Sequence, residues 1–68
     1  MTDTVELAKV LAGMPEVPTE IAARMGWSMP TYYSRINGRS EWTASEIVNF
    51  TSLARLSKPH RDAIFLRD

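Results

Sequence analysis

The fold is decided by residues 18–38, which read PTEIAARMGWSMPTYYSRING. Pro18 favours the start of a helix, because the N–H that proline lacks would have no helical partner at a first position. Two helices that cross steeply can approach closely only where a small side chain such as Ala22 lies between them. The tight turn that follows needs a residue that tolerates positive φ, which Gly26 supplies. The stretch therefore predicts two short helices joined at a steep angle.

Turn residues divide the remaining chain into further short helical segments, and no long run alternates apolar and polar side chains as a strand does. The clearest start signal is a capping box of Thr43 and Glu46, flanked by Trp42 and Ile47 at the positions of a hydrophobic staple. We expect an all-α chain of five helices in one compact domain that covers residues 1–68. The expected helices span about residues 4–13, 18–25, 28–36, 43–54 and a short stretch after Ser57.

Helical spacing also predicts which side chains point into the core. The two tryptophans, Trp27 and Trp42, are expected to pack in the core and the staple rather than to stack on nucleic-acid bases. The other expected core residues are Leu7, Ala8, Leu11, Ala12, Ile21, Ala22, Met25, Tyr32, Ile36, Ile47, Val48, Phe50, Leu53, Ala54, Ala63, Ile64 and either Leu66 or Phe65.

Composition excludes several classes of protein. The chain has no cysteine and a single histidine, His60, so disulfides and thiolate metal sites are excluded, and no metal or other cofactor is expected. No apolar run approaches the roughly 20 residues of a membrane span, and nothing resembles a signal peptide. No glycine-rich phosphate loop occurs, and a serine, a histidine and an aspartate are not by themselves a catalytic triad. We expect a soluble intracellular protein that is not an enzyme.

The formal net charge is zero, but the charges are unevenly distributed along the chain. Residues 21–39 contain Arg24, Arg35 and Arg39 and no acidic residue. A neutral protein with one purely basic segment can bind DNA through that face. Three arginines also occur on ordinary solvated surfaces, and charge alone favours that plainer explanation.

The chain resembles the Cro- and lambda-repressor-like (XRE-type) helix-turn-helix family, in particular its short phage-type members, over about residues 5–66. Three blocks carry the resemblance, TEIAARMGWS at residues 19–28, YSRINGR at 33–39 and EWTASEI at 41–47. The resemblance implies a compact five-helix, lambda-repressor-like DNA-binding domain whose helix-turn-helix covers about residues 18–38. It also implies a transcription regulator, a Cro-like protein or minimal repressor of a phage or prophage, acting at the nucleoid in the bacterial cytoplasm.

In this family the exposed face of the second helix of the motif enters the major groove, where hydroxyl and methyl groups contact the bases. A helical wheel turns Tyr32 and Ile36 toward the core and leaves the opposite face exposed. Arg39 is expected to contact a phosphate, helped by the backbone N–H groups of Asn37 and Gly38. The expected DNA-binding residues are Ser28, Met29, Pro30, Thr31, Tyr33, Ser34, Arg35, Asn37 and Arg39.

The chain departs from the family pattern where base contacts are usual. Pro18 stands where many members begin the first helix of the motif with glutamine. Met29 and Pro30 replace the glutamines and arginines that are common at the start of the recognition helix. Two other interpretations therefore stay open: a protein-interaction module on the same fold, such as an antirepressor or adaptor, and an antitoxin that represses its own operon.

One short recognition helix contacts few bases, so proteins of this kind usually engage two half-sites about one helical turn apart. We expect a homodimer on a pseudo-palindromic operator in double-stranded DNA. The expected interface lies in residues 52–68, because three apolar residues there are in excess of what the core needs. These residues are Leu56, Phe65 and Leu66.

Overall fold

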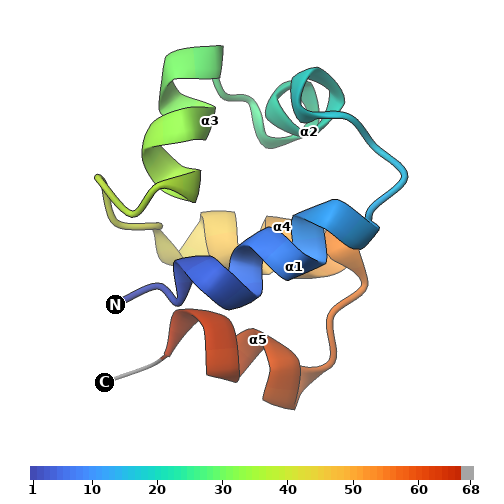
Figure 1. The fold of residues 1–68 in the computed structure, drawn as a ribbon, viewed down its shortest axis with the longest axis vertical. Helices are drawn as coiled ribbons and strands as arrows, with labels where there is room; N and C mark the ends of the chain where they lie inside the picture. Colours follow the sequence, from blue (N-terminus) through green and yellow to red (C-terminus); the bar gives the residue numbers. More distant parts are fainter. Residues whose placement is uncertain (67–68) are drawn as a thin grey trace.

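The structure, a computed structural model, describes residues 1–66, and its regular elements in that range are five helices and no strand (Figure 1). The helices are α1 (Thr4–Gly13), α2 (Pro18–Met25), α3 (Met29–Ile36), α4 (Ala44–Ala54) and α5 (Lys58–Phe65). The expected all-helical fold is confirmed. None of these helices has the length and apolar character that crossing a bilayer would require.

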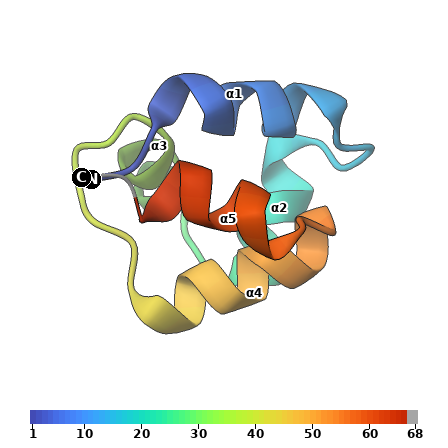
Figure 2. The same cartoon turned by 90° about the horizontal axis from the view of Figure 1, so that it is seen from below.

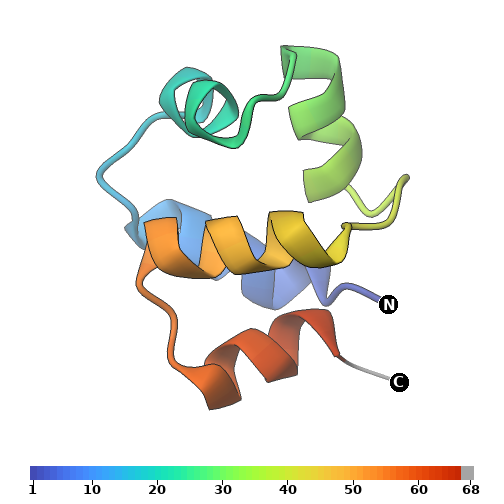
Figure 3. The same ribbon diagram turned by 180° about the vertical axis from the view of Figure 1, so that it is seen from behind.

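The helices form three tiers in the view of Figure 1, with α2 and α3 at one end, α1 and α4 in the middle and α5 at the other end. Seen from behind in Figure 3, α4 lies across the front of the middle tier, with α1 behind it. The radius of gyration of the Cα atoms is 10.8 Å, close to the roughly 11 Å expected of a compact chain of this length. The Asp3 N–H donates to the Ile64 carbonyl at 2.7 Å, so the start of α1 lies beside the end of α5 (Figure 2).

Four of the five helices begin at a residue whose side chain accepts a hydrogen bond from the backbone N–H three positions later. These bonds satisfy N–H groups that a helix otherwise leaves unpaired, which is why the sequence signals predicted the starts closely. The exception is α2, where Pro18 is the first residue and the Glu20 carboxylate accepts from the Val17 N–H at 3.1 Å. The four capping residues are Asp3, Ser28, Thr43 and Ser57.

The core forms where the inner faces of the five helices meet, and aromatic rings connect its parts. The Trp42 ring lies edge-on to Phe50 at 5.2 Å between centroids and tilted against Phe65 at 4.7 Å. Such pairs contribute about 0.5–1.5 kcal/mol beyond the area that they bury. Trp42 therefore ties α4 to α5. The buried side chains are Leu7, Ile21, Ala22, Tyr32, Trp42, Phe50, Ile64 and Phe65.

Some residues that helical spacing assigned to the core lie at the surface. Val48 is 63% exposed, because α4 turns only a narrow stripe around Phe50 inward and Val48 falls outside it. A helix on a small core buries a stripe of little more than about 100°. At the end of α5, Phe65 is buried and Leu66, the residue after the helix, is 63% exposed, so Phe65 is the core residue of the two. The other residues wrongly assigned to the core are Ala8, Ala12 and Ala63.

The apolar residues expected to be free for a dimer interface are mostly used by the core. Phe65 is buried, and Leu56 is partly buried and packs against the same cluster. Both side chains therefore already have intramolecular contacts. Of the three residues that suggested the interface, Leu66 alone is exposed.

Candidate nucleic-acid interface

The connection between α2 and α3 turns at Gly26, which has a φ of 72°. The Gly26 N–H donates to the Ala23 carbonyl at 3.2 Å, and the Trp27 N–H donates to the Ala22 carbonyl at 2.8 Å. These bonds satisfy carbonyl groups at the end of α2. A left-handed residue with a side chain costs roughly 1–2 kcal/mol, which glycine avoids. The positive φ expected at Gly26 is confirmed.

One face of α3 holds it to the rest of the molecule. Tyr32 is buried, and Ile36 and Met29 are partly buried against the core. The Trp27 ring, just before α3, lies 6.4 Å from the Tyr32 ring between centroids. Burial, followed by the neighbouring Tyr33, raises the pKa of Tyr32. The inward direction expected of Tyr32 and Ile36 is confirmed.

The opposite face of α3 and the residues at its ends reach solvent. Tyr33 is 52% exposed, although its ring lies edge-on to that of Tyr32 at 5.3 Å. Pro30 and Ser28 are exposed at the beginning of the helix, and Asn37 and Arg39 just beyond its end. The remaining four residues expected to bind DNA are half-buried: Met29, Thr31, Ser34 and Arg35.

The hydroxyl groups of this segment bond to one another in two pairs. Ser28 Oγ donates to Thr31 Oγ1 at 3.0 Å and also accepts from the Thr31 N–H, which caps α3. Thr31 Oγ1 accepts in this pair, so its own proton remains available to a ligand. Ser34 Oγ and Ser40 Oγ share a hydrogen bond of 2.9 Å. Ser34 thus fastens the chain that follows α3 to the helix.

Arg35 does not project freely from α3, contrary to what the helical wheel suggested. Its Nε and Nη2 atoms donate to the two carboxylate oxygens of Glu46 at 2.9 and 3.2 Å, and its Nη1 donates to Ser40 Oγ at 2.6 Å. The guanidinium carbon lies 5.9 Å from the centroid of the Trp27 ring. Contact between Arg35 and a DNA base would therefore require breaking a bidentate ion pair.

Glu46 is the anchor of this arrangement. Besides Arg35, its carboxylate accepts from Trp27 Nε1 at 3.0 Å and from the Thr43 N–H at 2.9 Å. The hydrogen bond from Arg35 lowers the pKa of Glu46 to about 2 and raises the pKa of Arg35. We call Trp27, Arg35, Ser40 and Glu46 the Glu46 cluster. It ties the α2–α3 turn and α3 to the first turn of α4.

Sequence reasoning found Glu46 as a capping residue and missed its other partners. Arg35 and Trp27 lie 11 and 19 positions from Glu46, and no short-range pattern signals contacts at those separations. One hint is that Arg35 is part of a segment without acidic residues. A half-buried arginine needs an anionic partner from another part of the chain, because an unpaired buried charge is costly.

The segment after α3 presents one free cation. Arg39 is exposed, and the ion pairs of residues 1–66 do not include it. The Asn37 and Gly38 N–H groups, which were expected to help bind a phosphate, donate instead to the Tyr33 and Arg35 carbonyls at 2.9 and 3.4 Å. The guanidinium of Arg39 is thus the group of this segment that is left for an anion.

Comparisons with protein-family models, curated proteins and solved structures give no match for this chain. Within residues 1–66, no three His, Asp or Glu side chains are grouped as metal ligands would be. The surface of α3 offers hydroxyl donors, an exposed phenol ring and, beyond the helix, one unpaired guanidinium.

Proposed function

We propose that this protein is a sequence-specific DNA-binding regulator, in which α2 and α3 form a helix-turn-helix and the exposed face of α3 enters the major groove. The observation that carries the proposal is the two-sided character of α3. Tyr32 holds one side in the core, while Thr31 and Tyr33 flank the side that reaches solvent. The helix itself lies at one end of the molecule (Figure 1). A helix with its side chains is about 10–12 Å across, which suits a major groove about 12 Å wide.

The proposed contacts follow from the groups that remain available. The Thr31 hydroxyl donates to a base acceptor, and Tyr33 contacts base edges or the sugar-phosphate backbone. Pro30 offers apolar surface to a thymine methyl group. Arg39 binds a phosphate from beyond the helix. Arg35 acts as a positioning residue, because its donors are occupied by the Glu46 cluster.

Binding by two copies is part of the proposal. With 8 residues, α3 is about 12 Å long and spans the rise of only three or four base pairs. Two half-sites about one helical turn apart would give a site long enough for selective binding. The expected ligand is thus a pseudo-palindromic operator bound by a pair of chains.

Selection of oligonucleotides from a random pool, with the full chain as bait, tests the proposal. We expect enrichment of paired half-sites about one helical turn apart, bound more weakly as the salt concentration rises. Recovery of sequences without any shared motif, from a chain that circular dichroism shows to be folded, would contradict sequence-specific binding.

A second candidate is a protein-interaction module on the same fold, such as an antirepressor or adaptor. The ion pair of Arg35 with Glu46 favours it, because Arg35 is the one cationic residue of α3 and its donors are occupied. A folded chain that selects no DNA sequence is its expected behaviour. An antitoxin would share the DNA chemistry of the first proposal and would differ by co-purifying with a toxin.

A further inference from the structure

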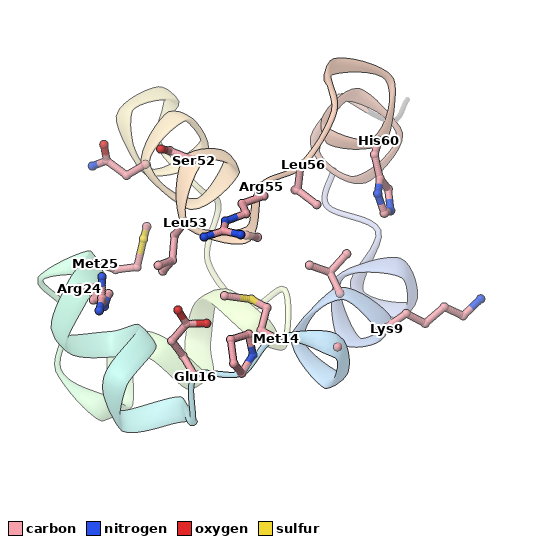
Figure 4. A pocket seen from close by; sticks show the side chains of 15 residues that line it. Lys9, Met14, Glu16, Arg24, Met25, Ser52, Leu53, Arg55, Leu56 and His60 are labelled. Atoms are coloured by element: carbon pink, nitrogen blue, oxygen red, sulfur yellow. The ribbon is translucent and has the colours of Figure 1, made fainter.

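A cavity of about 1090 Å³ opens between α1, α2, α4 and α5 (Figure 4). Its lining residues lie within residues 9–25 and 49–60, and none of them belongs to α3. We call it the α1–α4 groove. It is open to solvent along one side, so it suits a segment of a larger molecule better than an enclosed small ligand.

The floor of the groove is apolar. Met14, Met25, Leu53 and Leu56 line it and are only partly buried, although they pack against the core. Methionine side chains are flexible and polarizable, so they adapt to ligands of different shape. An occupant with apolar side chains would therefore bury surface that the chain alone leaves partly exposed.

The polar part of the lining is predominantly basic. Its charged members are Lys9, Arg24 and Arg55 against a single acid, Glu16, and Lys9 pairs with Glu6 outside the groove. The ion pairs within residues 1–66 leave both Arg24 and Arg55 without a carboxylate partner. Two guanidinium groups beside one groove make a binding place for carboxylates or other oxyanions.

Arg55, one of the groove residues, has an unusual backbone conformation. It ends α4 in the left-handed conformation, with a φ of 56°, and it is the one residue other than glycine with positive φ in residues 1–66. Glycine or asparagine would fit that conformation with less strain. Strain of this kind concentrates at functional sites, where the side chain has a role besides stability.

Glu16 distinguishes between possible anionic occupants. Its carboxylate is part of the lining, and in Figure 4 the Glu16 and Arg55 side chains extend toward the cavity. A carboxylate accepts hydrogen bonds and repels other anions, so the occupant should supply a donor at this point of the groove. The phosphates of DNA offer acceptors only. A peptide offers backbone N–H donors and can carry carboxylates as well.

We propose that the α1–α4 groove binds an acidic, partly apolar peptide segment of a protein partner. Carboxylates of the segment pair with Arg24 and Arg55, its apolar side chains cover the floor, and a backbone N–H donates to the Glu16 carboxylate. This function goes beyond DNA binding and does not depend on it. Because α3 does not line the groove, a partner could be held while α3 is engaged elsewhere.

The test begins with a displayed library of short random peptides, panned against the full chain. We expect the recovered peptides to combine acidic and apolar residues. The best of them is then titrated and followed by amide NMR shifts and by fluorescence anisotropy. Arg24→Gln and Arg55→Asn should each weaken binding by roughly 2- to 5-fold, the effect of losing one exposed ion pair. Asparagine is chosen at position 55 because it tolerates the left-handed backbone.

Arg39→Gln is the matched control, because it removes the same charge from an unpaired arginine outside the groove. It should leave peptide binding unchanged and weaken DNA binding. The two groove variants should weaken peptide binding and leave DNA binding unchanged. A failure of peptide binding is thus distinguishable from a failure of DNA binding. Melting curves for each variant establish that the fold is intact.

Several outcomes would overturn the groove proposal. Recovery of basic peptides, or of no consensus, would exclude an acidic partner. Displacement of the bound peptide by inorganic phosphate or duplex DNA would make the groove a general anion site. Shifts of the groove amides that grow with protein concentration, without peptide, would identify a second copy of this chain as the occupant.

Discussion

Glu46 links three parts of the molecule through one carboxylate, and its ionisation makes stability depend on pH. Hydrogen bonds from Arg35, which has the largest effect, and from Thr43 and Trp27 lower the pKa of Glu46 from 4.5 to about 2, and the Glu46 side chain is only 16% exposed. A carboxyl whose folded pKa is depressed stabilises the fold fully above its unfolded pKa and loses that contribution as pH falls. We expect a loss on the order of 2–3 kcal/mol in the free energy of unfolding between about pH 4.5 and pH 2. Urea unfolding at a series of pH values measures it.

Glu46→Gln is the control for this prediction. The amide keeps the size of the side chain and removes the titrating group, so the variant should be less stable near neutral pH and decline less on acidification. Equal acid sensitivity of the two proteins would show that other carboxyl groups govern the acid transition.

Two residues end helices in the left-handed conformation, and they should respond oppositely to substitution. Gly26 has a φ of 72° and open space around the position of a Cβ atom, so Gly26→Ala should cost about 1–2 kcal/mol through the backbone alone. Arg55→Gly relieves the same strain at the end of α4 and should stabilise the fold by about 0.5–1 kcal/mol. The gain is smaller than the strain itself, because glycine raises the conformational entropy of the unfolded chain. Thermal melts would decide, and a less stable Arg55→Gly variant would contradict the strain assigned to Arg55.

At the scale of one element, substitutions on the two faces of α3 should have different effects: those on the buried face should lower stability, and those on the exposed face should lower DNA binding. Tyr32→Ala removes a buried ring and should cost about 3–5 kcal/mol of stability. Thr31→Ala changes a half-buried position and should alter stability by about 0.5 kcal/mol or less. Tyr33→Ala also removes the ring that lies edge-on to Tyr32, so it should cost about 0.5–1.5 kcal/mol. Each of these two should weaken specific DNA binding by roughly 1–3 kcal/mol. Melts paired with binding titrations separate loss of fold from loss of contact.

Arg35→Ala should act like Tyr32→Ala, mainly on the stability of the fold, because it leaves Glu46 half-buried without its ion-pair partner. It should destabilise by about 1–3 kcal/mol. If it melts like the unsubstituted chain and still loses sequence selectivity, Arg35 contacts a base directly and its role in the Glu46 cluster is secondary. If folded Thr31→Ala and Tyr33→Ala variants bind DNA as the unsubstituted chain does, α3 is not a recognition helix.

The elements also show which features a sequence can reveal. Helix starts are local events, so Ser28 and Thr43 could be found from side chains within a few positions. Burial is not local: Val48 fits an apolar helical stripe, yet α4 leaves it in solvent. The ion pair of Arg35 with Glu46 depends on how α3 and α4 meet, which no spacing within either helix encodes. The sequence could thus predict which residues form the candidate DNA surface. It could not predict which of their polar groups are already occupied by contacts within the molecule.

At the scale of the whole molecule, stability rests on few side chains. A chain of this size buries only about 60% of its unfolded surface, and its total free energy of unfolding is expected to be roughly 3–10 kcal/mol. The ring of Trp42 contacts those of Trp27, Phe50 and Phe65. Its Nε1 donates to the Arg35 carbonyl at 3.2 Å. One side chain therefore joins the end of α3 to α4 and α5.

Trp42→Ala should consequently cost about 3–5 kcal/mol, a large part of the total, and lower binding of DNA and of the acidic peptide together. Trp42→Phe keeps an aromatic ring in the cluster and loses the indole donor, so a smaller loss of about 1–3 kcal/mol is expected. Circular dichroism and the fluorescence of Trp27 should give coincident unfolding curves for both variants, as in a single cooperative transition. If Trp42→Ala abolishes DNA binding and leaves peptide binding intact, α3 unfolds separately from the helices that line the groove, and the five helices do not form one cooperative unit.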